Sequence, residues 1–227
     1  AAVAWLHGRR GPAPRPELAL CRLAVRALHM RLPGAPEAAY LFGEMDENVD
    51  STVDAAVLLA RQHPSTVLAV CDVDNARLGS PIPGYGAAPY LLRRLEAAGI
   101  DKNKIQLIEF DHSGMIHTLL EAETVVRHAR AHGWRSLAVV APAFHLLRAA
   151  MTTASVAIRE HPQLKVYPVP GSPLSWTAQA LHSQGMTGVR SDFIGTELDR
   201  ILRYTAKGDI LPCEELERYF GECENAS

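Results

Sequence analysis

The sequence predicts an open, doubly wound α/β sandwich of three layers, in which a mostly parallel sheet of about five strands carries helices on both faces. Two observations support this fold class. The chain contains short runs that are apolar throughout, which is typical of strands buried on both faces of a parallel sheet. Segments with helical spacing alternate with these runs through short connections. The runs are AAYLF (38–42), TVLAVC (66–71), KIQLIEF (104–110), SLAVVA (136–141) and LKVYPV (164–169).

Helices are predicted between these strands and at both ends of the chain. The N-terminal segment 16–32 places leucines and a valine where they can cover a core, and segments 191–208 and 212–222 have the pattern of two closing helices. The helices between the strands are STVDAAVLLARQ (51–62), YGAAPYLLRRLEAAG (85–99), HTLLEAETVVRHARAHG (117–133) and FHLLRAAMTTASVAIRE (144–160).

The chain has no internal repeat and no linker long enough to divide it, so we expect a single domain over residues 1–227. Within it, residues 1–35 form an N-terminal helical extension, 38–205 the core, and 206–227 a C-terminal helix and tail. The longest irregular segment is 170–192. It is interpreted either as a lid with Trp176 and Arg190 facing a cleft or as a surface loop without a ligand role.

Composition narrows the classes of partner. The 227 residues are 48% apolar and 21% charged with a formal net charge of −2, and lysine and arginine are interspersed with acids. The sequence shows no stripe of basic residues that could bind nucleic acid or an anionic membrane. The apolar run at the start of the sequence is too short for a membrane span. The four cysteines lack CxxC spacing, which argues against a disulfide framework and a zinc site. A cytoplasmic protein with a small-molecule ligand is expected, and its oligomeric state is left open.

The loops that follow the strands are the predicted site, because ligands of open parallel sheets bind beyond the carboxyl ends of the strands. Polar and ionisable residues gather in these loops, although some such residues are needed anyway for caps and turns. The polar and ionisable residues are Glu44 and Asp46 after the first run, Asp72 and Asp74 after the second, Asp111 and His112 after the third, and His145 and Arg148 after the fourth; Gly43, Ala143 and Phe144 lie in the same loops.

His145 and Arg148 stand three positions apart at the head of a helix that begins near Pro142 or Ala143. This spacing places both on one face of the first two turns, near free backbone N–H groups and the positive end of the helix dipole. Arg148 could hold an anionic or polar group there while His145 donates or removes a proton. The alternative is that both are surface residues of an amphipathic helix.

Thr118 and Glu121 have the three-residue spacing of a capping box at the start of the helix over 117–133. That role would explain the pair without any function. Cys71, at the end of the second run, is interpreted as a small buried residue rather than a nucleophile.

A TxxEA helix start, a GW pair and a small-residue loop running into FHLLRA together resemble the YdcF/SanA/ElyC family. The resemblance covers about residues 38–205, and the His145 and Arg148 segment is its most specific part. It implies a Rossmann-like domain whose cleft lies over the strand ends and binds nucleotide-type ligands such as S-adenosylmethionine. The matching residues are Thr118, Glu121, Ala122, Gly133, Trp134, His145, Arg148 and Ala149.

The sequence departs from the family where glycine-rich turns are usual. Gly43 is kept, but Glu44, Asp46, Asp72 and Asp74 stand in or beside these turns. Acidic side chains repel phosphate. These acids are therefore expected to hold a cationic group of the ligand or a divalent metal, or else only to cap helices. A hydroxyl expected just before the histidine loop is replaced by Ala141 and Pro142.

The function expected from these features is a transferase or hydrolase acting on a small polar metabolite, with S-adenosylmethionine, a nucleotide or a divalent metal as the cofactors considered. Its catalytic residues are predicted to be His145 and Glu121. The alternatives are a non-catalytic binding module with the same cleft, and a metal-assisted phosphohydrolase, which needs the acids to converge. The predicted ligand-binding residues are Arg148, Thr118, Gly43, Glu44, Asp46, Asp72, Asp74, His117, Ala143 and Phe144.

Overall fold

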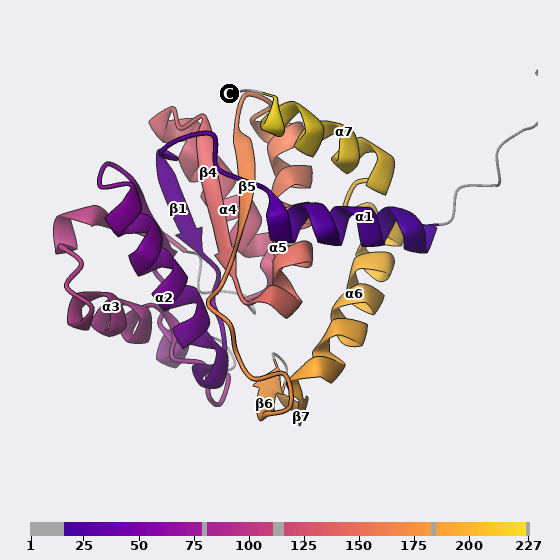
Figure 1. Ribbon diagram of the computed structural model, residues 1–227. Helices are drawn as coiled ribbons and strands as arrows, with labels where there is room; N and C mark the ends of the chain where they lie inside the picture. Colours follow the sequence, from indigo (N-terminus) through magenta and orange to yellow (C-terminus); the bar gives the residue numbers. More distant parts are fainter. Residues whose placement is uncertain (1–15, 79–80, 111–115, 183–184, 226–227) are drawn as a thin grey trace, which may run out of the picture.

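The computed structural model of the chain describes residues 16–78, 81–110, 116–182 and 185–225. At its centre lies a sheet of five parallel strands in the order β3-β2-β1-β4-β5, which confirms the predicted fold class and is consistent with a Rossmann-like fold (Figure 1). Residues 1–15 of the predicted N-terminal extension, and the predicted loop residues Asp111 and His112, lie outside the described part. The strands are β1 (Ala38–Leu41), β2 (Val67–Cys71), β3 (Ile105–Ile108), β4 (Ser136–Ala141) and β5 (Lys165–Pro170).

The two faces of the sheet bury two separate apolar clusters, as the uniformly apolar runs predict. Successive side chains of a strand point to opposite faces. Tyr40 and Phe42 accordingly belong to one cluster, and Ala39 and Leu41 to the other. This double burial explains why the central strands lack the alternating pattern of a half-exposed sheet. The edge strand β3 differs from the prediction, because only its Ile108 is fully buried and its Leu107 is exposed.

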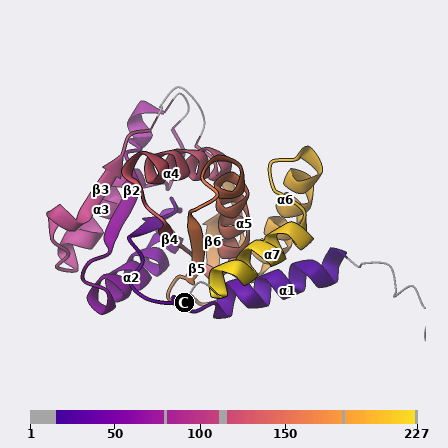
Figure 2. The ribbon, with the colours of Figure 1, turned by 90° about the horizontal axis from the view of Figure 1, so that it is seen from above.

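Helices cover both faces of the sheet (Figure 2). One face packs against α2 (Asp46–Gln62) and α3 (Ala87–Ala97), and the other against α4 (Thr118–His132) and α5 (Ala143–Glu160). Helices α1, α6 and α7 pack against α5, and α1 and α7 also contact β5, which confirms the predicted N-terminal and closing helices. Their bounds are α1 (Pro16–His29), α6 (Phe193–Lys207) and α7 (Cys213–Glu224), and single 3₁₀ turns are η1 (Asn75–Arg77), η2 (Lys102–Lys104) and η4 (Arg190–Asp192).

Local sequence signals fix the ends of the helices that carry the site. The GW pair after α4 places Gly133 in the left-handed region, at φ 70°, while the Trp134 N–H bonds back to the Ala129 carbonyl. Glycine is favoured there because it has no Cβ to clash. Helix α2 begins five residues earlier than the segment predicted from Ser51, with Asp46 in its first turn. An acid there complements the positive end of the helix dipole.

The segment 170–192, predicted to be irregular, contains an antiparallel hairpin of β6 (Gln179–His182) and β7 (Met186–Val189). Arg190, which follows β7, is buried and anchors this region to α2. Its Nε donates to the Asn48 side chain at 3.1 Å, and its Nη1 donates to the Ser175 carbonyl. Each strand has only four residues, which is too short to show a clear alternation of apolar and polar residues. The hairpin was therefore not predicted from the sequence.

The order of the strands places a crevice between β1 and β4. After β1 the chain turns into α2 on one face of the sheet, and after β4 it turns into α5 on the opposite face. Loops that diverge in this way leave an opening beyond the carboxyl ends of the two strands, where ligands of such sheets bind. Among the residues that the structure describes, no helix is both long and apolar enough to cross a membrane.

Candidate functional site

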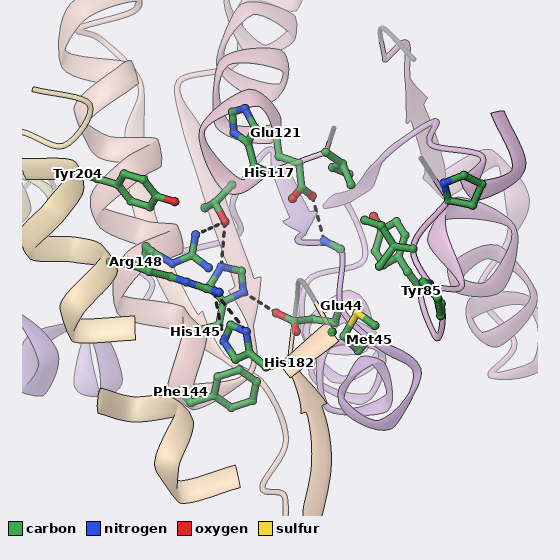
Figure 3. A pocket seen from close by; sticks show the side chains of 18 residues that line it. Glu44, Met45, Tyr85, His117, Glu121, Phe144, His145, Arg148, His182 and Tyr204 are labelled. Atoms are coloured by element: carbon green, nitrogen blue, oxygen red, sulfur yellow. Dashed lines mark hydrogen bonds and ion pairs between the residues drawn. The ribbon is translucent and has the colours of Figure 1, made fainter. Parts of the chain in front are cut away.

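A cavity of about 420 Å³ opens at the carboxyl ends of β1 and β4 (Figure 3). His145 and Arg148 lie across the cavity from Met45 and Tyr85, while Glu44 lies beside Met45 and Phe144 beside His182. The polar lining residues are Glu44, His117, Thr118, Glu121, His145, Arg148, His182, Arg200 and Tyr204. The rest of the lining comprises Gly43, Met45, Pro81, Ile82, Pro83, Tyr85, Ile116, Phe144 and Gly185.

His145 is held in one orientation by Glu44. Both residues are buried, and His145 Nδ1 forms a short hydrogen bond with Glu44 Oε1. Because a carboxylate only accepts, Nδ1 is the protonated ring nitrogen and the neutral ring keeps a lone pair on Nε2. Phe42 at the end of β1 supports the ring edge-on, at 5.7 Å between ring centroids. The pair therefore joins the loop after β1 to the first turn of α5.

Thr118 links this pair to Arg148. Its Oγ1 lies 3.3 Å from His145 Nε2 and accepts a short hydrogen bond from Arg148 Nη1. Guanidinium groups only donate, so the hydrogen of the threonine hydroxyl remains for Nε2. The result is a relay of four buried side chains from Glu44 through His145 and Thr118 to Arg148.

Arg148 is balanced by Glu197 on α6. Its Nε and Nη2 both reach the Glu197 carboxylate, the latter at 3.0 Å, and the same carboxylate accepts from His182 Nε2 at 2.9 Å and from Arg200 Nη1 at 3.0 Å. Burial alone would raise the pKa of Glu197, but the charge of Arg148 and the hydrogen bond from His182 hold that pKa well below its usual range. Glu197 is therefore ionised at neutral pH.

Glu121 is a buried residue of the cavity lining and fixes the loop after β1. Its Oε1 accepts from the Gly43 N–H at 3.0 Å and from the Tyr40 hydroxyl at 2.9 Å. Burial raises the pKa of Glu121 above its ordinary value, against the lowering effect of these two hydrogen bonds. The predicted capping box is wrong. The cap of α4 is His117, whose Nδ1 accepts from the Leu120 N–H at 3.2 Å, and Thr118 and Glu121 turn into the site instead.

Cys71 is buried at the end of β2, as predicted. Its Sγ lies 3.1 Å from the Tyr40 hydroxyl, and burial raises the pKa of the thiol far above its usual value. A thiol that stays protonated is a poor nucleophile.

The structure brings together most of the predicted site residues. The cavity lining includes Gly43, Glu44, His117, Thr118, Glu121, Phe144, His145 and Arg148. Ala143 lines a second cavity, of about 510 Å³, together with Trp176 and Arg190, and Phe144 lies between the two cavities. Trp176 and Arg190 thus do not face the site.

Three of the predicted acids lie away from the cavity lining. Asp46 and Asp72 are exposed, and Asp74 caps η1 by accepting from the Ala76 N–H while it pairs with Arg77. The capping alternative therefore describes Asp74. Within the described ranges no three histidine, cysteine or acidic side chains are grouped so that they could hold a metal ion.

The sequence analysis did not predict four polar residues that line or support the cavity: His182, Glu197, Arg200 and Tyr204. All follow residue 170 and match no motif. A signal was nevertheless present, because Phe193, Glu197, Arg200 and Ile201 recur at the spacing of a buried helical face. Two charged residues on a face that is otherwise apolar indicate a buried ion pair.

No protein-family model matches this chain, and no curated protein is significantly similar to it.

Proposed function

We propose that this chain is a YdcF-like enzyme that acts on a small polar metabolite, by transfer or hydrolysis, in the cavity between β1 and β4. The observation that carries the proposal is the buried His145, whose Nδ1 is held by Glu44 and whose Nε2 points to Thr118 in the cavity wall. A base that is oriented by a third group is the arrangement used in general acid–base catalysis.

The resemblance of the sequence supports the same site. Four of the residues that match the family pattern have polar or charged side chains, and all four line one cavity although they come from two helices. They are Thr118, Glu121, His145 and Arg148. A family pattern that served packing alone would not require polar side chains to converge in this way. The position at the switch between β1 and β4 is also where open α/β sheets bind ligands.

The chemistry of the walls indicates the kind of ligand. A volume of about 420 Å³ is of the size that holds a metabolite. The ligand that fits has a polar reacting end toward His145 and an apolar or aromatic part toward Met45 and Tyr85. An S-adenosylmethionine-like or nucleotide ligand meets this description.

In the proposed reaction His145 takes a proton from a hydroxyl group or water at Nε2 and later returns it to the leaving group. Glu44 stabilises the positive charge that the ring then carries. Glu121 positions the loop after β1 through the Gly43 N–H. Arg148 is paired with Glu197, so it acts in this scheme by polarising Thr118 rather than as an unpaired anion-binding group.

The test is thermal unfolding against S-adenosylmethionine, its demethylated product, nucleotides, amines and divalent metals. A ligand at a hundred times its Kd stabilises the native state by about 2.7 kcal/mol, a shift of several degrees for a chain of this size. We expect the shift to vanish in His145→Ala and to remain in His29→Ala, which removes an exposed histidine of α1. A shift that survives in both variants would place the ligand elsewhere, and no shift with any compound would contradict the proposal.

A non-catalytic binding module would show the same shift. Turnover of the stabilising compound, and loss of that turnover in His145→Ala, separates an enzyme from such a module.

A further inference from the structure

The hydroxyl of Thr118 has no structural task that explains its burial. Threonine at the start of a helix ordinarily caps it, but here the cap of α4 is the ring of His117. Thr118 is only 6% exposed, and its Oγ1 contacts two functional-type side chains, His145 and Arg148, at the cavity wall. This placement is unusual for a hydroxyl that serves packing alone.

The direction of each hydrogen bond at Thr118 is fixed by its neighbours. Glu44 accepts from His145 Nδ1, which leaves Nε2 as the acceptor, and Arg148 Nη1 donates to Oγ1. The hydroxyl therefore points its hydrogen at Nε2, 3.3 Å away. A nucleophile hydrogen-bonded to a base, which is itself oriented by a carboxylate, is the geometry of covalent catalysis by a hydroxyl group.

Arg148 favours the reactive form of that hydroxyl. A cation that donates to Oγ1 stabilises the negative charge that develops there and on an adjacent carbonyl oxygen. Glu197 balances the guanidinium charge from its far side, so the cation can be kept buried without a substrate.

We propose that Thr118 is the nucleophile of this site and that its substrate is a carboxylic ester with an apolar acyl group. The proposal rests on the proposed function, in which His145 is the base. Two features favour an ester over a phosphoryl group. The Glu44 carboxylate lies beside His145 in the cavity lining and repels a phosphate dianion, while the charge of Arg148 is already balanced by Glu197. The wall formed by Met45, Ile82 and Tyr85 suits an apolar acyl chain.

The reaction has two halves. In the first, Thr118 Oγ1 forms a bond to the carbonyl carbon as its proton moves to His145 Nε2. The bond from that carbon to the alcohol oxygen then breaks, and His145 gives the proton to the departing alkoxide. In the second half, a water molecule adds to the acyl-threonine as His145 takes its proton, the bond to Oγ1 breaks, and the proton returns to Oγ1 with release of the carboxylic acid.

The test uses p-nitrophenyl acetate and p-nitrophenyl hexanoate with the full chain. Release of p-nitrophenolate is followed by rapid mixing, and the acyl adduct is located by intact mass and peptide mapping. We expect an early burst of about one equivalent with the adduct on Thr118. Thr118→Val, which replaces the hydroxyl with a methyl group of similar size, should lower the rate by roughly a hundredfold or more. Thr118→Ser should restore the adduct.

The matched control is Thr124→Val, which changes a buried threonine of the same helix outside the cavity lining and should keep the burst. An adduct on another residue, an unchanged rate in Thr118→Val, or no adduct in the wild-type chain would each overturn the assignment of Thr118. The proposed function would survive these results if a ligand still gave a shift that depends on His145. Should Thr118→Val fail to fold, the site of the wild-type adduct and the serine variant still decide the question.

Discussion

The ion pair between Arg148 and Glu197 gives the sharpest prediction about stability. Glu197→Gln keeps the size of the side chain but removes the negative charge that balances Arg148 and Arg200, all three of which are buried. Breaking a buried pair by removing one partner leaves an uncompensated charge and costs about 3–5 kcal/mol. We therefore expect the free energy of unfolding at pH 7 to fall by roughly that amount, measured by urea denaturation.

The pH dependence of this loss tests its cause. Because the pKa of Glu197 is held below its usual range, the ionised carboxylate contributes stability that is fully present above about pH 4.3, the ordinary value for glutamate. That contribution is lost as the pH falls toward the lowered pKa, so the difference between wild type and Glu197→Gln should shrink in acid. Asp199→Asn, an exposed change on the same helix, should stay within about 0.5 kcal/mol of wild type. A loss of that small size in Glu197→Gln, or one that does not vary with pH, would refute the argument.

Other predictions concern the cavity lining and the cysteines. Because burial raises the pKa of Glu121, its stabilising contribution is present below the ordinary value of glutamate and is lost as the pH rises through the raised pKa. The urea midpoint of Glu121→Gln should therefore rise relative to that of wild type between about pH 4 and pH 7. A difference between the two midpoints that does not change with pH would contradict this. Thiol titration of the native chain should modify the exposed Cys21 quickly and Cys71 only after denaturation, since burial keeps that thiol protonated; rapid reaction of Cys71 would show that it is accessible. Gly43→Ala would place a Cβ 2.2 Å from the Tyr85 hydroxyl oxygen and should cost about 1–3 kcal/mol, with partial recovery in Gly43→Ala combined with Tyr85→Phe; no cost in a thermal melt would refute the contact.

The fold was predictable because its signal is local. Each buried strand is a short apolar run, and the helices between them carry a periodic face, so the alternation of the two types was visible without long-range information. The hairpin of β6 and β7 was missed because its strands are short and their exposure is mixed.

The site was predictable only in part, because the sequence shows spacing along a helix and not the partner across the cavity. The pair His145 and Arg148 could be placed at the head of α5, but their partners Glu44 and Glu197 lie 101 and 49 residues away. The same limit explains the error over Thr118 and Glu121. Their three-residue spacing fits both a capping box and a shared cavity wall, and the residue that caps the helix, His117, precedes Thr118 by one position.

The most direct test of the account is the tautomer of His145, read from the ¹⁵N shifts of its ring in the native protein at neutral pH. We expect the ring proton on Nδ1 and the lone pair on Nε2 toward Thr118, because the Glu44 carboxylate can only accept. Glu44→Leu should remove this preference, and exchange of His29 for alanine should leave it unchanged. A ring protonated on Nε2 in the wild-type chain would contradict the account, because Nε2 could then accept no proton from a substrate or from Thr118.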